Sequence, residues 1–132
     1  MNFSKLKFLM ISAAAAVILL VQTTASQAAE LVMFEQEYCE WCEAWHDEIA
    51  AVYPLTDEGR LLPLRAIDIH DDRPTDLKAV RGVRFTPTFV VMEKGKEVGR
   101  ILGYSDEAMF YWQLSEIIAK LSRKQAGLAN DS

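Results

Sequence analysis

Two cysteines, Cys39 and Cys42, are the only ones in the chain, and two residues separate them in the stretch EYCEWCEAWHDEI. At the start of a helix this spacing allows a disulfide, because a bridge needs Cα atoms about 4.4–6.8 Å apart. The two sulfurs could form a redox couple, bind a metal ion or clip the chain. The elements that position the sulfurs decide between these chemistries.

The residues that follow the first cysteine favour a redox couple. Cys42, Trp45, Ile49 and Val52 recur at intervals of three or four, which predicts an amphipathic helix from Cys39 to about Val52. Free backbone N–H groups and the helix dipole stabilise a thiolate at the N-terminus, so the pKa of the Cys39 thiol should fall below its usual value of about 8.5. Cys39 is therefore the expected nucleophile, and Cys42, one turn inside the helix, is the expected resolving thiol.

Acidic side chains surround the two cysteines. Nine acids and no Lys or Arg occur between Glu30 and Glu58. Negative neighbours oppose a thiolate and partly cancel the effect of the helix dipole. Because a strong oxidant has a highly stabilised thiolate, we expect this couple to be nearer to a reductant.

Two alternatives remain open from the residues alone. Cys39, Cys42 and His46 share a helical face and could bind a metal ion, but zinc normally takes four ligands and His70 is the only other histidine. A purely structural disulfide gains little, because so small a loop has little chain entropy to lose. Metal analysis of the reduced protein tests the first alternative, and insulin reduction by wild type and Cys39→Ser tests the second.

The N-terminus is typical of a secretory signal peptide over residues 1–28. Lys5 and Lys7 precede an uncharged apolar run over residues 8–21, and the small polar stretch QTTASQAA follows. We expect cleavage after Ala28 and export to the periplasm. An uncleaved membrane anchor is the alternative, although the apolar run is shorter than the ~20 residues that a bilayer requires. Disulfides persist in oxidising compartments, so an exported pair is free to cycle.

Length and charge limit the remaining possibilities. The chain of 132 residues has room for one domain, which we expect over residues 29–122, followed by a frayed tail over 123–132. Removal of the leader takes away two of the 14 basic residues and none of the 19 acidic residues, which leaves a net charge of −7. Such a surface argues against nucleic acid as a partner.

Hydrophobic patterns predict alternating strands and helices around the cysteine helix. An apolar strand, Leu31–Glu35, leads directly into the cysteines. After the cysteine helix, the expected elements are a turn over 53–60, a strand over Leu64–Ile69, a short helix over Thr75–Val80, a hairpin of strands Thr88–Met92 and Glu97–Leu102, and a helix after Ser105. This order, β-α-β-α-β-β-α, predicts an α/β fold in which three helices flank a four-stranded mixed sheet on both faces.

Aromatic residues near the cysteines divide into expected contact and core positions. Trp41, between the cysteines at the helix start, should be exposed and offer an apolar platform to a protein disulfide. Tyr38 is a second candidate for substrate contact. Trp45 and Phe34 are expected to pack in the core, and so is Trp112 in the last helix.

Taken together, these residues resemble the thioredoxin-fold superfamily. The resemblance rests on LVMFEQEYCEWC, on GVRFTPTFVVMEKGKEVGRILGY with its Thr86-Pro87 pair, and on the closing helix, and it spans roughly residues 30–122. It implies a minimal thioredoxin-like fold with a redox-active disulfide between Cys39 and Cys42.

The resemblance also implies how a substrate is held. Pro87 is expected to be cis and to lie beside the cysteines, and the backbone of Thr86 to pair with an extended substrate segment as an added strand. Arg84 belongs to the same loop and could supply the cation that the cysteine helix lacks, or lie on the surface. Thioredoxins carry a buried acid six residues before the first cysteine, where this chain has Met33, so proton transfer needs another group, Glu35 or water.

More narrowly, the leader, the short domain and the stretch CEWCEAWHDEI resemble the small periplasmic thioredoxins, of the SoxS type, that accompany bacterial sulfur-oxidation systems. This resemblance implies a periplasmic thiol-disulfide oxidoreductase that reduces protein disulfides or modified thiols and keeps the thiol of a sulfur-carrier protein reduced. We expect a monomer without cofactor or metal that receives electrons from a membrane or periplasmic donor. A thiol oxidase or isomerase of the same fold is the alternative within this class.

Overall fold

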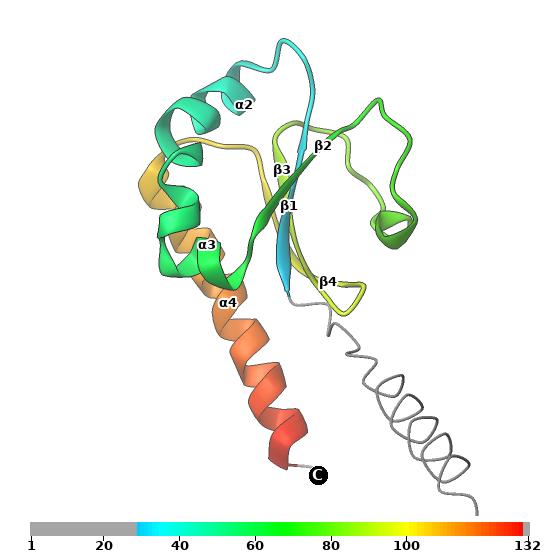
Figure 1. Ribbon diagram of the computed structural model, residues 1–132, viewed down its shortest axis with the longest axis vertical. Coiled ribbons are helices and arrows are strands. Elements are labelled where there is room, and N and C mark those ends of the chain that lie inside the picture. Colours follow the sequence, from blue (N-terminus) through cyan, green and yellow to red (C-terminus); the bar gives the residue numbers. More distant parts are fainter. Residues whose placement is uncertain (1–28, 131–132) are drawn as a thin grey trace, which may run out of the picture.

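A computed structural model describes residues 29–130, so the expected signal peptide lies outside the described residues. The fold is a four-stranded sheet with the strand order β2-β1-β3-β4. The α-helices of the described residues lie on one side of this sheet, and the segment that joins β2 to β3 crosses the other side (Figure 1). The predicted α/β fold with a mixed four-stranded sheet is confirmed, but the second face is covered by a loop with only a short 3-10 turn.

The four strands lie close to their predicted positions. They are β1 (Glu30–Glu35), β2 (Leu64–Asp68), β3 (Thr88–Glu93) and β4 (Lys96–Leu102). The strand β1 pairs in parallel with β2 and antiparallel with β3, which in turn pairs antiparallel with β4. Both central strands, β1 and β3, are buried on both faces, which explains why their sequences are continuous apolar runs.

A helix begins directly after the β1 strand and its connecting loop. It consists of α2 (Glu40–Trp45) and a π-helical turn, η1 (His46–Ala50). Together they confirm the predicted helix, and Cys39 is its N-cap residue. Val52, which was expected to continue the apolar face, lies beyond the helix and is exposed.

The predicted turn over residues 53–60 is wrong, because this segment is helical. A 3-10 turn, η2 (Tyr53–Leu55), leads into α3 (Asp57–Leu61). The Thr56 side chain caps α3 by accepting a hydrogen bond from the Gly59 N–H, at 3.0 Å. Gly59 is required in this helix, because a Cβ atom there would lie 1.8 Å from the carbonyl oxygen of Tyr53.

Two other helices differ in length from their predictions. The helix predicted over 75–80 is a single 3-10 turn, η3 (Thr75–Leu77), whereas α4 (Glu107–Asn130) continues well past residue 122 into the segment predicted to be frayed. The prediction that Trp112 packs in the core is wrong, since 60% of its surface is exposed. The buried face of α4 is formed by Phe110, Leu114, Ile117 and Leu121, and Trp112 points away from it.

The sheet separates two hydrophobic clusters. The larger cluster lies on the helical side and contains both cysteines, Leu31 and Met33 of β1, and the fully buried side chains of Trp45 and Tyr53. The smaller cluster lies under the β2–β3 connection. It consists of Val32, Phe34, Leu77, Val80, Val90 and Met92. The predicted burial of Trp45 and Phe34 is confirmed, with one residue in each cluster.

Candidate active site

Cys39 is the last residue of the loop that connects β1 to α2. Its backbone is extended, and its Sγ atom accepts a hydrogen bond from the Cys42 N–H at 3.2 Å. Its carbonyl oxygen accepts hydrogen bonds from the N–H groups of Cys42 and Glu43, both at 3.0 Å. The sulfur therefore serves as the helix cap and faces the backbone donors that would stabilise a thiolate.

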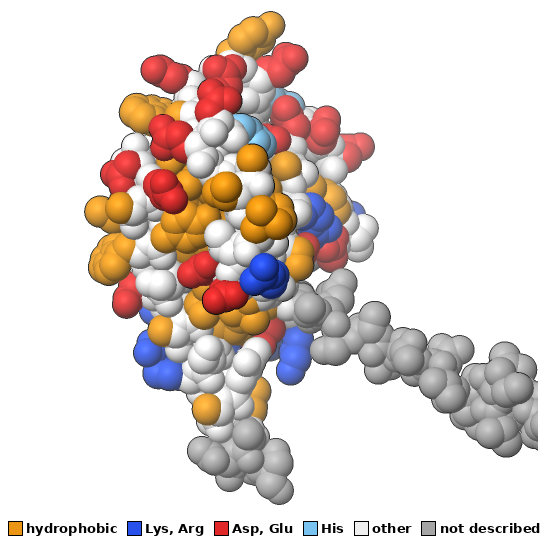
Figure 2. All heavy atoms as spheres, turned by 60° about the vertical axis from the view of Figure 1, so that its left-hand side comes forward, with side chains coloured by type: hydrophobic (Ala, Val, Ile, Leu, Met, Phe, Trp, Pro, Cys, Tyr) orange, Lys and Arg blue, Asp and Glu red, His pale blue; other side chains and the backbone are white. Residues whose placement is uncertain are grey.

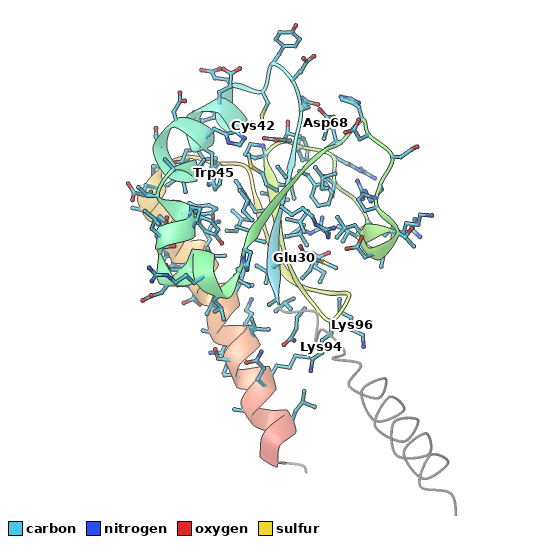
Figure 3. All side chains as sticks on the ribbon, in the orientation of Figure 1. Glu30, Cys42, Trp45, Asp68, Lys94 and Lys96 are labelled. Atoms are coloured by element: carbon cyan, nitrogen blue, oxygen red, sulfur yellow. A yellow bond between two sulfur atoms is a disulfide. The ribbon has the colours of Figure 1, made fainter. Side chains whose placement is uncertain are left out.

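The two cysteines form a disulfide with a Cα–Cα distance of 5.2 Å. Both residues are largely buried, with Cys39 7% exposed and Cys42 3% exposed, so the residue expected to attack a substrate is the slightly more exposed of the two. Figure 3 shows Cys42 at the end of the sheet opposite the β3–β4 hairpin, where Lys94 and Lys96 lie. The redox pair therefore occupies one pole of the domain.

Aromatic side chains pack between the cysteine helix and the elements that it lies against. The Trp45 ring lies between α2 and the sheet (Figure 3) and contacts the rings of Phe89, at a centroid distance of 5.3 Å, and Phe110, at 5.7 Å. Phe89 and Phe110 also contact each other at 5.0 Å. Because the three rings come from α2, β3 and α4, they fix the helix against the sheet and hence the position of Cys39 at its tip.

The loop that contains Thr86 and Pro87 lies at the same pole. The Thr86–Pro87 peptide bond is cis. The loop leads into β3, whose first residue, Thr88, pairs with Phe34 near the end of β1, just before the cysteine loop. A hydrogen bond of 2.8 Å from the Gly103 N–H to the Pro87 carbonyl oxygen joins this loop to the end of β4.

Exposed aromatic side chains surround the pair. Tyr38 is 94% exposed and has a positive φ of 57°, which is uncommon for a residue other than glycine. Trp41 is exposed, as predicted, and so is Phe85, which directly precedes Thr86. The sequence analysis did not single out Phe85, although an apolar residue next to the Thr-Pro pair was a usable signal. Arg84 is exposed and forms no ion pair within residues 29–130.

Acidic side chains gather around the pole that bears α2, whereas Lys and Arg lie mainly towards the other end (Figure 2). In the described part of the chain, none of the acids on α2 pairs with Lys or Arg. Glu48 of η1 instead accepts a hydrogen bond from the Tyr104 hydroxyl at 2.5 Å. Burial and this hydrogen bond raise the pKa of Tyr104 above its usual value, which keeps the hydroxyl a donor.

The side chains of Glu35 and His46 form a hydrogen bond between the end of β1 and the start of η1. The Nε2 atom of His46 lies 2.5 Å from Oε2 of Glu35. His46 is thus held by a carboxylate, and the two sulfurs are bonded to each other. No group of three His, Cys, Asp or Glu side chains within residues 29–130 is arranged to hold a metal ion.

A hollow of about 460 Å³ opens beside the cysteine loop. It is lined by Gln36, Glu37, Tyr38, Asp68, His70 and Asp71. The surface next to the disulfide is therefore accessible. It is formed by this hollow, by the exposed aromatic side chains and by the loop before β3. In the described region, no helix has both the length and the apolar composition needed to cross a membrane.

Comparisons with known proteins agree with this geometry. Residues 19–118 match the model of a thioredoxin-like domain. The chain is 44% identical to the periplasmic thioredoxin SoxS from Paracoccus pantotrophus, whose reduced form is known, over 70% of this chain and 98% of that one, with a TM-score of 0.68. A search of curated proteins found no match.

Two more distant structures show the same fold. A thioredoxin from Thermus thermophilus is 23% identical over 70% of this chain and 75% of that one, with a TM-score of 0.56. The thioredoxin Mala s 13 of Malassezia sympodialis is 21% identical over 72% and 79%, with a TM-score of 0.52. This chain, with its disulfide at the tip of α2, therefore belongs to the thioredoxin-like family and is a thiol-disulfide oxidoreductase.

Proposed function

We propose that this protein is a periplasmic reductase of protein disulfides or modified thiols, with Cys39 as the nucleophile and Cys42 as the resolving thiol. The observation that carries this proposal is the position of Cys39, whose sulfur caps α2 by accepting a hydrogen bond from the Cys42 N–H. The similarity to a periplasmic thioredoxin, SoxS, supports the compartment.

The reaction proceeds in two exchanges. The Cys39 thiolate attacks one sulfur of the target disulfide, which breaks the S–S bond and releases the first target thiolate. The Cys42 sulfur then attacks Cys39, which releases the second thiolate and closes the Cys39–Cys42 disulfide. The protein dithiol loses two electrons, the target disulfide gains them, and the two protons pass to the product thiols.

Thr86 and the exposed aromatic residues bind the target in this proposal. The backbone of Thr86 forms no hydrogen bond within residues 29–130, so it is free to pair with an extended segment as an added strand. Trp41 and Tyr38 provide apolar contact beside the sulfurs. Pro87 shapes the loop through its cis peptide bond, and Arg84 contributes a solvent-exposed charge in the same loop.

The direction of electron flow follows from the charge of the site. Unpaired acids on α2 oppose a stabilised thiolate, which favours a reductant over an oxidase or isomerase. A titration of the reduction potential tests this direction. A value well below about −200 mV supports the reductase, and a value near about −120 mV contradicts it.

The partner in this proposal is a protein with an oxidised or modified thiol, and the best-matching case is the carrier thiol of a sulfur-oxidation system, with electrons supplied by a membrane or periplasmic donor. The deciding experiment is an insulin-reduction assay with wild type, Cys39→Ser and Cys42→Ser. Cys39→Ser should be inactive, and Cys42→Ser should accumulate a mixed disulfide on Cys39. Equal activity of wild type and Cys39→Ser would sink the proposal.

A further inference from the structure

A hydrogen bond between the side chains of Glu35 and His46 bridges the segment that carries both cysteines. Glu35 is the last residue of β1, and His46 directly follows α2, so the pair links the two ends of the redox segment at 2.5 Å. The Glu35 side chain is 26% exposed and the His46 side chain is 41% exposed. The pair therefore lies between the buried core and solvent.

The orientation of both residues places them on the side of Cys42. Side chains alternate along β1, and Leu31 and Met33 belong to the cluster that contains the cysteines, so Glu35 points to that same face. His46 follows Cys42 by four residues, and its N–H group donates to the Cys42 carbonyl oxygen. Residues at this spacing lie above one another on one side of a helix.

Resolution creates a need for a proton acceptor at this position. Cys42 is 3% exposed, and its thiol must lose its proton before it can attack the mixed disulfide. Met33, which packs in the same cluster, has no group that could accept a proton. Water has little access to so buried a thiol.

The neighbouring elements carry several acidic groups and one further imidazole, that of His70, which lines the same hollow as Glu37 and Asp68. The acidic groups are Glu37 of the loop, Glu40 and Glu43 of α2, Asp47 and Glu48 of η1, and Asp68 of β2, which is in register with Glu35. Within residues 29–130, none of these carboxylates contacts an imidazole side chain or bridges β1 to the cysteine helix. Glu35 has both properties, because it contacts the imidazole of His46 and this contact joins β1 to the cysteine helix.

We propose that the Glu35–His46 pair is the proton-transfer site of Cys42, an inference that rests on the proposed reductase function. When Cys42 attacks Cys39, the Cys42 thiol proton moves to the pair, and the target leaves as a thiolate. The partly exposed imidazole passes this proton to solvent or to the leaving thiolate. When a donor reduces the disulfide again, the pair returns a proton to Cys42.

Single-turnover kinetics of the resolving step test the inference. Reduced protein is mixed with an oxidised peptide, quenched with acid at intervals and analysed for the mixed disulfide by mass spectrometry. Glu35→Gln should slow resolution by about 10²-fold, the lower end of what general acid-base catalysis contributes, and the mixed disulfide should accumulate. The resolution rate of this variant should rise with pH across the alkaline range, because Cys42 must then ionise without help.

Matched variants separate proton transfer from a structural role. Glu116→Gln removes an exposed carboxylate of α4 that forms no ion pair within residues 29–130, and it should resolve like wild type. Glu35→Asp keeps the carboxylate and should recover most of the rate, and His46→Gln should lose part of it. The first attack by Cys39, measured in a Cys42→Ser background, should be unchanged by Glu35→Gln.

Several results would overturn the inference. These are wild-type resolution by Glu35→Gln with the wild-type pH profile, equal slowing of both exchange steps, or failure of Glu35→Asp to restore the rate. The test is distinct from that of the proposed function. If wild type reduces the peptide through Cys39 but Glu35→Gln behaves identically, only the proton-transfer site is lost, whereas inactivity of wild type removes the reductase proposal itself.

Discussion

The two faces of the sheet are covered in different ways. On one face, α2, η2 and α4 contribute large aromatic side chains to the cluster that contains the disulfide. On the other face, the connection between β2 and β3 covers a smaller aliphatic cluster around Phe34 with only one 3-10 turn. The redox pair belongs to the helical face, where interlocking rings hold it in place.

The loop-covered face relies on arginines as tethers. Arg65 of β2 donates to Glu30 and to Asp76 of η3, both at 2.7 Å. The Arg73 guanidinium lies 4.8 Å from the centre of the Phe34 ring and donates to the Val80 carbonyl oxygen at 2.7 Å. Polar contacts of this kind are individually weaker than aromatic burial. Substitutions on the loop-covered face should therefore lower the free energy of unfolding less than substitutions on the helical face.

The largest loss of stability is expected on the helical face. Trp45→Ala empties a fully buried site between three elements and should lower the free energy of unfolding by about 3–5 kcal/mol. Urea denaturation of the oxidised protein measures the change. Trp112→Ala is the matched control, because this exposed side chain should cost no more than about 0.5 kcal/mol. A Trp112→Ala loss comparable with that of Trp45→Ala would contradict the assigned burial.

A smaller loss is expected for the buried residue of the loop. Leu77→Ala in η3 should cost about 2 kcal/mol, the low end for such a truncation, because a loop can relax into the cavity more readily than packed helices. The same denaturation experiment measures it, with exposed Leu55→Ala as control. If Leu77→Ala were as costly as Trp45→Ala, the two faces would be equally rigid and the comparison would fail.

The Arg73 tether should contribute less again. Arg73→Met keeps most of the aliphatic chain but removes the cation over Phe34 and the hydrogen bond to Val80, which should cost about 1 kcal/mol. Arg84→Met, at an exposed position without an ion pair in residues 29–130, is the control and should be close to neutral. Equal stabilities of the two variants would show that Arg73 does not hold the loop.

The smallest effect should depend on pH. The hydrogen bond from Arg65 lowers the pKa of Asp76, so the folded state prefers the ionised carboxyl group. The stability from this pair is fully present above the usual pKa of an aspartate and is lost as the pH falls through the lowered value.

Asp76→Asn should therefore cost about 0.2–1 kcal/mol at neutral pH, because the pair is partly exposed. The difference from wild type should disappear in acid. Asp72→Asn provides the control, since Asp72 is exposed and forms no ion pair within residues 29–130. Thermal unfolding at a series of pH values measures both variants, and a constant Asp76→Asn penalty down to strongly acidic pH would disprove the linkage.

Local patterns in the sequence were sufficient for the strands and the cysteine helix, because apolar runs and helical spacing are properties of adjacent residues. The α3 helix was missed because Gly59 is a poor helix former, and the need for it comes from contact with Tyr53, which only the fold reveals. Trp112 was wrongly placed in the core, because a large apolar side chain was weighed above its position off the buried face of α4.

The site shows the same division between local and long-range information. Cys39 and Cys42 were identifiable from their spacing, and Thr86 and Pro87 from a family pattern. The pairing of Glu35 with His46 was not predictable, because it depends on how the β1–α2 loop closes over eleven residues. Residues joined across such a closure carry no signal in local periodicity.

A single atom, Sγ of Cys39, both carries electrons and terminates the first turn of α2. Any mutation that loosens this turn should therefore change the reduction potential of the disulfide, even where the mutated residue does not contact a sulfur atom. Conversely, forming or breaking the S–S bond should change the hydrogen-exchange rate of the Cys42 N–H, because this group donates to the Cys39 sulfur. The exchange rate at this turn should therefore report the oxidation state of the disulfide.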